Sequence, residues 1–200
     1  MGSSDRKGLR LSFNAPATLV FTALCVAVWL AGKLTGGKST LAAFSVYRAS
    51  LLDPLTYARC FTHVLGHAGG NHLLGNLMYI LLLGPMIEEK YGTKNVVIVI
   101  LTTAAVTGVI HMLFFSRTIL LGASGVVFAL ILMSSVTVRE DRTIPVTFIL
   151  VALLYLGQQV WQGITVKDNV SQITHVAGGA VGSVMGFLLS RRQNKKDRSY

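Results

Sequence analysis

Six uncharged, apolar runs constrain the fold of this chain more than any other feature of its sequence. They lie at about residues 13–32, 72–87, 95–114, 118–138, 144–163 and 171–190. A helix needs about 20 apolar residues to cross the hydrocarbon core of a bilayer. Of the 200 residues, 52% are hydrophobic and 13% are charged, which leaves too little polar surface to cover a water-soluble globule. The sequence therefore predicts an all-α membrane protein with six transmembrane helices.

The basic residues predict how these helices are oriented. Six spans put both termini on one side, and the segments expected there hold twelve of the eighteen Lys and Arg residues. The side richer in Lys and Arg is usually cytoplasmic. We therefore expect a cytoplasmic segment at residues 1–12, one membrane domain at residues 13–190 and a basic cytoplasmic tail at residues 191–200. The net charge of +10 then indicates contact with anionic lipid and no nucleic acid, because no aromatic residues are interleaved with the basic ones.

One connection, at about residues 36–71, is much longer than the others and falls on the outer side. It carries Leu, Phe, Tyr and Val throughout, with Pro54 as a breaker. A half-apolar loop of this kind is expected to lie against the membrane or dip into it, with non-helical backbone held by protein or water.

Four polar side chains from three predicted helices fall at one depth in the membrane. Counted at about 1.5 Å per residue from the cytoplasmic ends, Ser124, His175, His72 and Asn76 all lie about 20 Å above that boundary. His111 falls at the same level, so depth alone leaves two histidines that could serve Ser124. The motif "GASG" around Ser124 is by itself compatible with ordinary helix packing.

The residues around the two histidines favour His175. Gly178, Gly182 and Gly186 follow it at helical spacing, and a stripe of glycines lets two helix backbones approach closely. His111 is followed by the bulky residues "MLFF", which is typical of a core or lipid-interface histidine. We therefore expect His175 to approach Ser124.

This set of residues fits nucleophilic catalysis by serine. A serine hydroxyl scarcely ionises near neutral pH, and a neutral imidazole can take its proton as the oxygen attacks. His72 and Asn76 are four residues apart, so they share a helix face and could donate hydrogen bonds to an oxyanion. Since no carboxylate lies at this depth, the sequence predicts a Ser–His dyad without the aspartate of the usual triad.

Three motifs resemble those of the rhomboid intramembrane serine proteases in order and spacing: "FTHVLGHAGGNHLLGNLMYILLLGPMIEEKYG", "GASGVVFAL" and "HVAGGAVG". The resemblance covers about residues 56–190. It implies a six-helix rhomboid-like bundle with a cavity open to the outside, a submerged first loop and a movable fifth helix.

The resemblance also implies roles for individual residues. Ser124 is the expected nucleophile and His175 the general base, with His72 and Asn76 as oxyanion donors and Gly178 and Gly182 at a close helix contact. His63 and His67 are expected to be structural or water-binding loop residues, and no metal site is expected. Two positions depart from the common family pattern: Ala58-Arg59 replaces a Trp-Arg pair in the first loop, and Phe128 replaces a tyrosine as the aromatic support of His175.

The sequence thus predicts an intramembrane serine endopeptidase that needs no cofactor and cleaves transmembrane or membrane-adjacent segments near the outer face. Its expected partners are transmembrane protein substrates and the lipid bilayer, and its expected location is a bacterial cytoplasmic (inner) membrane. The alternative is a catalytically inactive rhomboid-like protein that binds or escorts membrane proteins. A transporter using the same polar layer is disfavoured, because the second and third spans lack matching broken helices.

Overall fold

The computed structural model describes residues 13–115, 117–136, 144, 146–165 and 169–197, and within them the chain is helical throughout its core. The expected segment at residues 1–12 and the end of the basic tail lie outside the described residues. The elements are α1 (Pro16–Leu34), α2 (Lys38–Ala43), α3 (Pro54–Thr62), η1 (His63–Leu65), α4 (Gly70–Tyr91), α5 (Thr93–Phe114), α6 (Ser124–Ser135), α7 (Val146–Thr165) and α8 (Asn169–Asp197).

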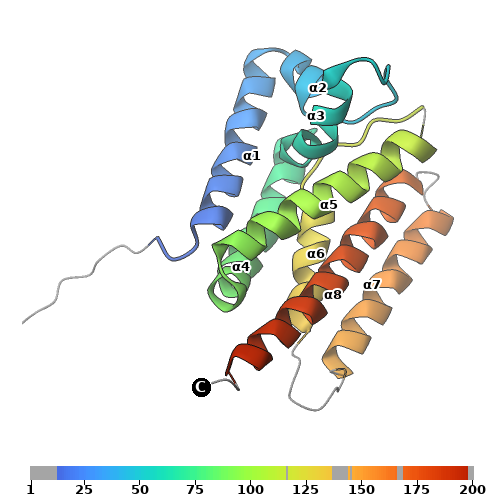
Figure 1. Cartoon of the computed structure of the whole chain (residues 1–200). Helices are drawn as coiled ribbons and strands as arrows, with labels where there is room; N and C mark the ends of the chain where they lie inside the picture. Colours follow the sequence, from blue (N-terminus) through green and yellow to red (C-terminus); the bar gives the residue numbers. More distant parts are fainter. Residues whose placement is uncertain (1–12, 116, 137–143, 145, 166–168, 198–200) are drawn as a thin grey trace, which may run out of the picture.

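The long helices form one bundle, with α1 at one edge and α7 at the opposite edge (Figure 1). The short helices α2 and α3 cover one end of the bundle, and α8 packs chiefly against α6 and α5. Helix α7 packs chiefly against α6 and α8. Helix α6 is largely buried, with Val126, Ala129 and Met133 wholly inaccessible.

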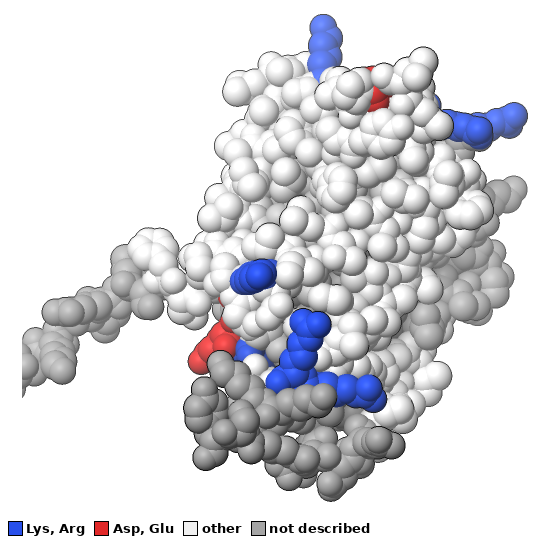
Figure 2. Space-filling model, viewed as in Figure 1, with Lys and Arg blue, Asp and Glu red and all other residues white. Residues whose placement is uncertain are grey.

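Each of the six predicted apolar runs overlaps one helix, but the six-span count remains a proposal. Among the described residues, three helical stretches have the length and hydropathy of a membrane span: Pro16–Leu34, Thr93–Phe114 and Gln172–Gln193. On the face seen in Figure 2, a broad band without charged side chains separates two ends where Lys, Arg, Asp and Glu gather. This distribution fits an integral membrane protein.

The run at residues 118–138 is not one long helix, which corrects the sequence-based expectation. Helix α6 has 12 residues and is about 18 Å long, too short to cross a bilayer by itself. The residues before it are extended, and Val46 and Leu120 exchange two backbone hydrogen bonds of 2.8 and 2.9 Å. Gly122 then adopts a φ of 129°, which L-residues rarely adopt and which prevents a helix from continuing through it.

The outer connection is also more regular than expected. It contains α2, α3 and η1, whereas the sequence suggested non-helical backbone with Pro54 as a breaker. Pro54 instead begins α3, and the Asp53 carboxylate accepts a hydrogen bond from the Leu55 amide. An Asp followed by Pro is a common start of a helix, so the sequence itself contains the signal for the beginning of α3.

Helix α1 is capped by a residue from another helix. Its own N-cap residue, Ala15, has no side chain that can accept a hydrogen bond. The buried carboxylate of Glu88, from the end of α4, accepts from the amides of Ala17 and Thr18 at 2.9 Å and from the Thr18 hydroxyl at 2.8 Å. A carboxylate at this place also opposes the positive end of the α1 dipole. Glu88 therefore fixes α1 to α4.

We predict that Glu88→Gln lowers the free energy of unfolding by about 2 kcal/mol, because hydrogen bonds to a charged group contribute roughly 1.5–3 kcal/mol. The matched control is Glu89→Gln, which removes the same charge from the exposed neighbouring position. Thermal unfolding of the detergent-solubilised variants measures the difference. Equal stability of the two variants would contradict the capping role of Glu88.

Candidate active site

The chain that leads into Ser124 is held by backbone hydrogen bonds to the outer loop. Beyond the Val46–Leu120 bridge, the Gly122 amide donates to the His63 carbonyl at 3.0 Å. Helix α6 then begins at Ser124, so the Ser124 amide lies in the first helical turn, whose N–H groups have no acceptor within the helix. The outer loop therefore sets where the Ser124 hydroxyl and amide are presented.

Helices α6 and α8 touch backbone to backbone through glycines. A methyl group added at Gly178 would collide with the carbonyl oxygen of Gly125, and one at Gly182 would lie 2.5 Å from the Cα atom of Ala129. At Gly186 the contacts are looser, since an added methyl would lie 3.3 Å from the Val136 side chain. Only glycine permits the approach at the first two positions.

This close crossing brings His175 to Ser124. The Nε2 atom of His175 lies 2.9 Å from the Oγ atom of Ser124, within hydrogen-bond distance. The ring of Phe128, one turn after Ser124, packs on the imidazole with its centroid 4.4 Å away. Both Ser124 and His175 are partly exposed, which leaves the pair within reach of a substrate.

His72 and Asn76 lie beside the backbone just before Ser124. A methyl group added at Gly122 would be 2.7 Å from Cε1 and 2.8 Å from Nε2 of His72, and 3.9 Å from the amide nitrogen of Asn76. Two side-chain nitrogens from one face of α4 thus flank the entry to the serine. This is where donors for an oxyanion on a substrate bound to Ser124 would have to stand.

His111, the second candidate base, contacts residues other than Ser124. It is fully buried, stacks on Phe115 with ring centroids 5.6 Å apart, and has its Nε2 atom 3.0 Å from the carbonyl oxygen of Thr118. It therefore holds the extended segment that leads to Ser124. Depth counting could not separate His111 from His175, because it ignores which way each helix faces.

The two loop histidines are buried and make hydrogen bonds to the protein. His63 has Nδ1 3.2 Å from the Arg59 carbonyl and Nε2 3.2 Å from the Thr107 hydroxyl. His67 has Nε2 3.0 Å from the Asn76 amide nitrogen. Among the residues that the structure describes, no group of three or more His, Cys, Asp or Glu side chains is arranged to hold a metal ion.

The first loop is anchored by Arg59 although Ala58 lacks the usual indole. Arg59 is buried, donates from Nε to the Ala42 carbonyl at 2.8 Å, lies 3.5 Å from the Asp53 carboxylate, and stacks on the Tyr47 ring. The sequence suggested a less firmly wedged loop, and these contacts show how the arginine is held. None of them could be inferred from the dipeptide alone.

The chain was compared with models of known protein families. A family model described as "Rhomboid domain" matches residues 54–192, which include Ser124, His175, His72 and Asn76. The match confirms the family resemblance seen in the three sequence motifs.

Proposed function

The rhomboid family model matches well over half of this chain, so the chain belongs to the rhomboid family, and we propose that it is an active intramembrane serine endopeptidase. The family acts on membrane-protein substrates within the bilayer, and the chain is an integral membrane protein. The single observation that carries the proposal is the 2.9 Å separation of Ser124 Oγ and His175 Nε2.

In the proposed reaction, Ser124 Oγ attacks the carbonyl carbon of the scissile peptide bond while His175 Nε2 takes the hydroxyl proton. The tetrahedral intermediate collapses when the carbon–nitrogen bond breaks, and His175 returns the proton to the leaving amine. A water molecule, with His175 again as base, then hydrolyses the acyl-enzyme and regenerates the serine. No cofactor enters these steps.

The oxyanion of the tetrahedral intermediate needs donors that are already in place. We assign this role to the imidazole of His72, the amide of Asn76 and the backbone amide of Ser124. The two side-chain nitrogens flank Gly122, and α6 directs the positive end of its dipole at the same point. Phe128 supports the His175 ring without a phenol hydroxyl.

The alternative is an inactive rhomboid-like protein that binds or escorts membrane proteins, since the family includes inactive members. An inactive relative is expected to lack the serine or the histidine, whereas this chain has both within hydrogen-bond distance. That distance favours the enzyme.

Covalent labelling tests the proposal. A fluorophosphonate reacts with an activated serine, so we expect the detergent-purified protein to be labelled and mass spectrometry to map the adduct to Ser124. The Ser124→Ala variant serves as the control and should take up no label. A label on another residue, or none on the folded wild type, would favour the inactive alternative.

We predict graded losses of activity when the oxyanion donors are removed one at a time. His72→Ala and Asn76→Ala should each lower kcat by about 10²- to 10³-fold, which is the usual effect of losing one donor while others remain. Steady-state kinetics with a cleavable transmembrane substrate measure both variants. If both retained full activity, neither side chain would belong to the oxyanion site.

The proposed position of the site predicts which bonds are cut. By the helix-rise count it lies about 10 Å inside the outer face, so cleavage is expected near the outer end of a substrate helix. Helix breakers should lower the free-energy cost of unwinding the substrate helix there, by up to about 1 kcal/mol for each glycine and about 3 kcal/mol for each proline. Because Gly122, Ala123 and Gly125 crowd Ser124, a small residue is expected before the cut.

Single-span substrates reconstituted in liposomes, differing only at that residue or in helix-breaker content, test this specificity, with the cut mapped by mass spectrometry. Preferred cleavage after large aromatic residues, or in the cytoplasmic half of an unbroken helix, would contradict it. We also propose, from the charge distribution, that both termini are cytoplasmic.

A further inference from the structure

His67 lies between the outer loop and the proposed oxyanion donors. It follows η1 in the loop that leads to α4, and only 4% of its surface is exposed. Its ring nitrogens face two different partners. Nδ1 is 3.1 Å from the carbonyl oxygen of Leu65, and Nε2 is 3.0 Å from the side-chain nitrogen of Asn76.

The first of these contacts determines the tautomer. A carbonyl oxygen can only accept a hydrogen bond, so Nδ1 of His67 must carry the proton that it donates to Leu65. In a neutral imidazole, Nε2 is then an acceptor without a proton. The group of Asn76 that faces Nε2 must therefore be its NH₂ group, which donates to His67.

This hydrogen bond fixes which end of the Asn76 amide faces the serine. The NH₂ group has two hydrogens, and His67 uses one of them. The same nitrogen lies 3.9 Å from the place of a methyl group added at Gly122, two residues before Ser124, so its second hydrogen is the one left for the proposed oxyanion site. If the amide were rotated by 180°, its carbonyl oxygen would face the developing oxyanion and repel it.

We propose that His67 is a positioning residue of the reaction: as an Nδ1-protonated acceptor, it holds the Asn76 amide with its N–H toward the oxyanion. This inference rests on the proposed protease function and on the role of Asn76 in it. His67 also packs edge-on against the His72 ring, with ring centroids 5.1 Å apart, and its hydrogen bond to Asn76 is the contact that orients an oxyanion donor. The Leu65 carbonyl in turn holds the tautomer of His67.

Two substitutions of similar size separate hydrogen bonding from packing. His67→Gln can place its Oε1 acceptor near the position of Nε2, whereas His67→Met fills a similar space without a comparable acceptor. We expect His67→Gln to keep kcat within about threefold of the wild type. His67→Met should lower kcat by about tenfold or more at unchanged KM, but no more than Asn76→Ala does.

A double-mutant cycle tests whether His67 acts through Asn76. In an Asn76→Ala background, His67→Met should cause no further loss of kcat. A purely structural role for His67 would instead give the same loss in both backgrounds, and that result would overturn the inference. Equal kcat values for His67→Met and the wild type would also overturn it.

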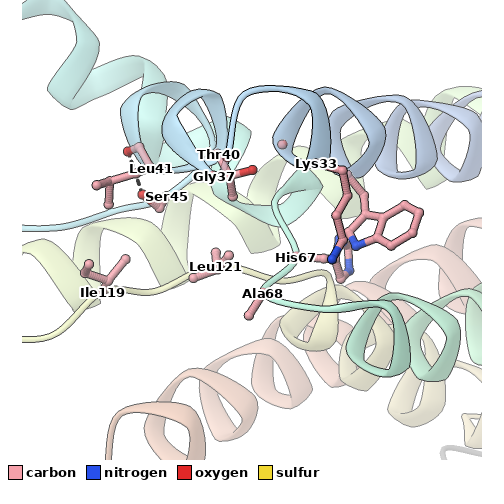
Figure 3. A pocket seen from close by; sticks show the side chains of 12 residues that line it. Lys33, Gly37, Thr40, Leu41, Ser45, His67, Ala68, Ile119 and Leu121 are labelled. Atoms are coloured by element: carbon pink, nitrogen blue, oxygen red, sulfur yellow. Dashed lines mark hydrogen bonds between the residues drawn. The ribbon is translucent and has the colours of Figure 1, made fainter.

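A cavity beside His67 offers a rescue experiment. His67 lines a cavity of about 430 Å³ together with Ala68, Leu121 and Lys33, among other residues (Figure 3). In a His67→Gly variant, added imidazole can therefore reach the vacated position. We expect imidazole to raise kcat of His67→Gly several-fold and to leave His67→Gly/Asn76→Ala unchanged. Equal rescue of the two variants would contradict an action through Asn76.

Nuclear magnetic resonance of ¹⁵N-labelled histidine and asparagine gives a readout that does not depend on activity. We expect Nδ1 of His67 to be protonated, and the Asn76 side-chain amide resonances to move in His67→Met. An active wild type with an Nε2-protonated His67 would overturn this inference alone. A wild type that cleaves no substrate and takes up no fluorophosphonate would overturn the proposed function, and the inference with it.

Discussion

Ser124→Ala is expected to abolish cleavage of a membrane substrate while leaving thermal stability nearly unchanged. The substitution removes the attacking oxygen, and loss of the nucleophile in a serine protease lowers kcat by roughly 10⁶-fold. It removes one partly exposed hydroxyl, so little packing is lost. Cleavage of a reconstituted transmembrane substrate and thermal unfolding of the same preparations measure the two effects.

The matched control is Ser134→Ala on the same helix. Its hydroxyl is bonded to the Ile131 carbonyl 2.8 Å away and is exposed, far along α6 from Ser124. This variant should retain activity. His175→Ala should be as inactive as Ser124→Ala, and the double variant no worse than either, because the two residues act as one unit. More than trace activity in either single variant would exclude the dyad.

Gly178→Ala and Gly182→Ala are expected to destabilise the fold and inactivate the protein together. In each variant, the added methyl group would collide with backbone atoms of α6. Backbone atoms cannot move aside as the end of a flexible side chain can. Overpacking of this kind costs about 1–3 kcal/mol, more than the roughly 1 kcal/mol gained by replacing a helical glycine with alanine. The helices would have to separate, and His175 would move away from Ser124.

Two other glycines provide graded controls for the same measurement. Gly186→Ala should be milder, because the nearest atoms are 3.3 Å away and belong to the Val136 side chain. Gly157→Ala should be neutral or stabilising, because no atom of the described residues lies within 4 Å of the added methyl. The four variants should therefore rank in the same order in thermal unfolding and in cleavage assays. Gly178→Ala and Gly182→Ala should be the most impaired, Gly186→Ala less so, and Gly157→Ala not impaired. Wild-type behaviour of Gly182→Ala would contradict a tight α6–α8 contact.

The residues that we propose to react could be grouped from the sequence because membrane helices restrict where polar groups can go. A hydroxyl, an amide or an imidazole in an apolar run stands out, and the constant rise of a helix converts sequence position into depth. That was enough to group Ser124, His175, His72 and Asn76. The glycine spacing after His175 then favoured it over His111, since close helix contact needs small residues.

Helix limits were less predictable, because hydropathy alone does not show where a helix starts. The run at 118–138 is uncharged throughout, yet its first part pairs with Val46 in an extended conformation, and among its described residues only Ser124–Ser135 is helical. The pairing partner lies more than seventy residues away in the chain. No local pattern could reveal it.

The sequence by itself determined the helical membrane class and the family, and it singled out the side chains that we propose to react, because periodicity, hydropathy and spacing are local properties. Only the tertiary structure decided which residues orient them. Glu88 caps α1 from another helix, His111 holds the segment before the serine, and His67 sets the direction of the Asn76 amide. The Glu88 hydrogen bond to Ala17 joins residues 71 positions apart, and the other two each join a helix to a neighbouring loop, so their geometry exists only once helices and loops have packed.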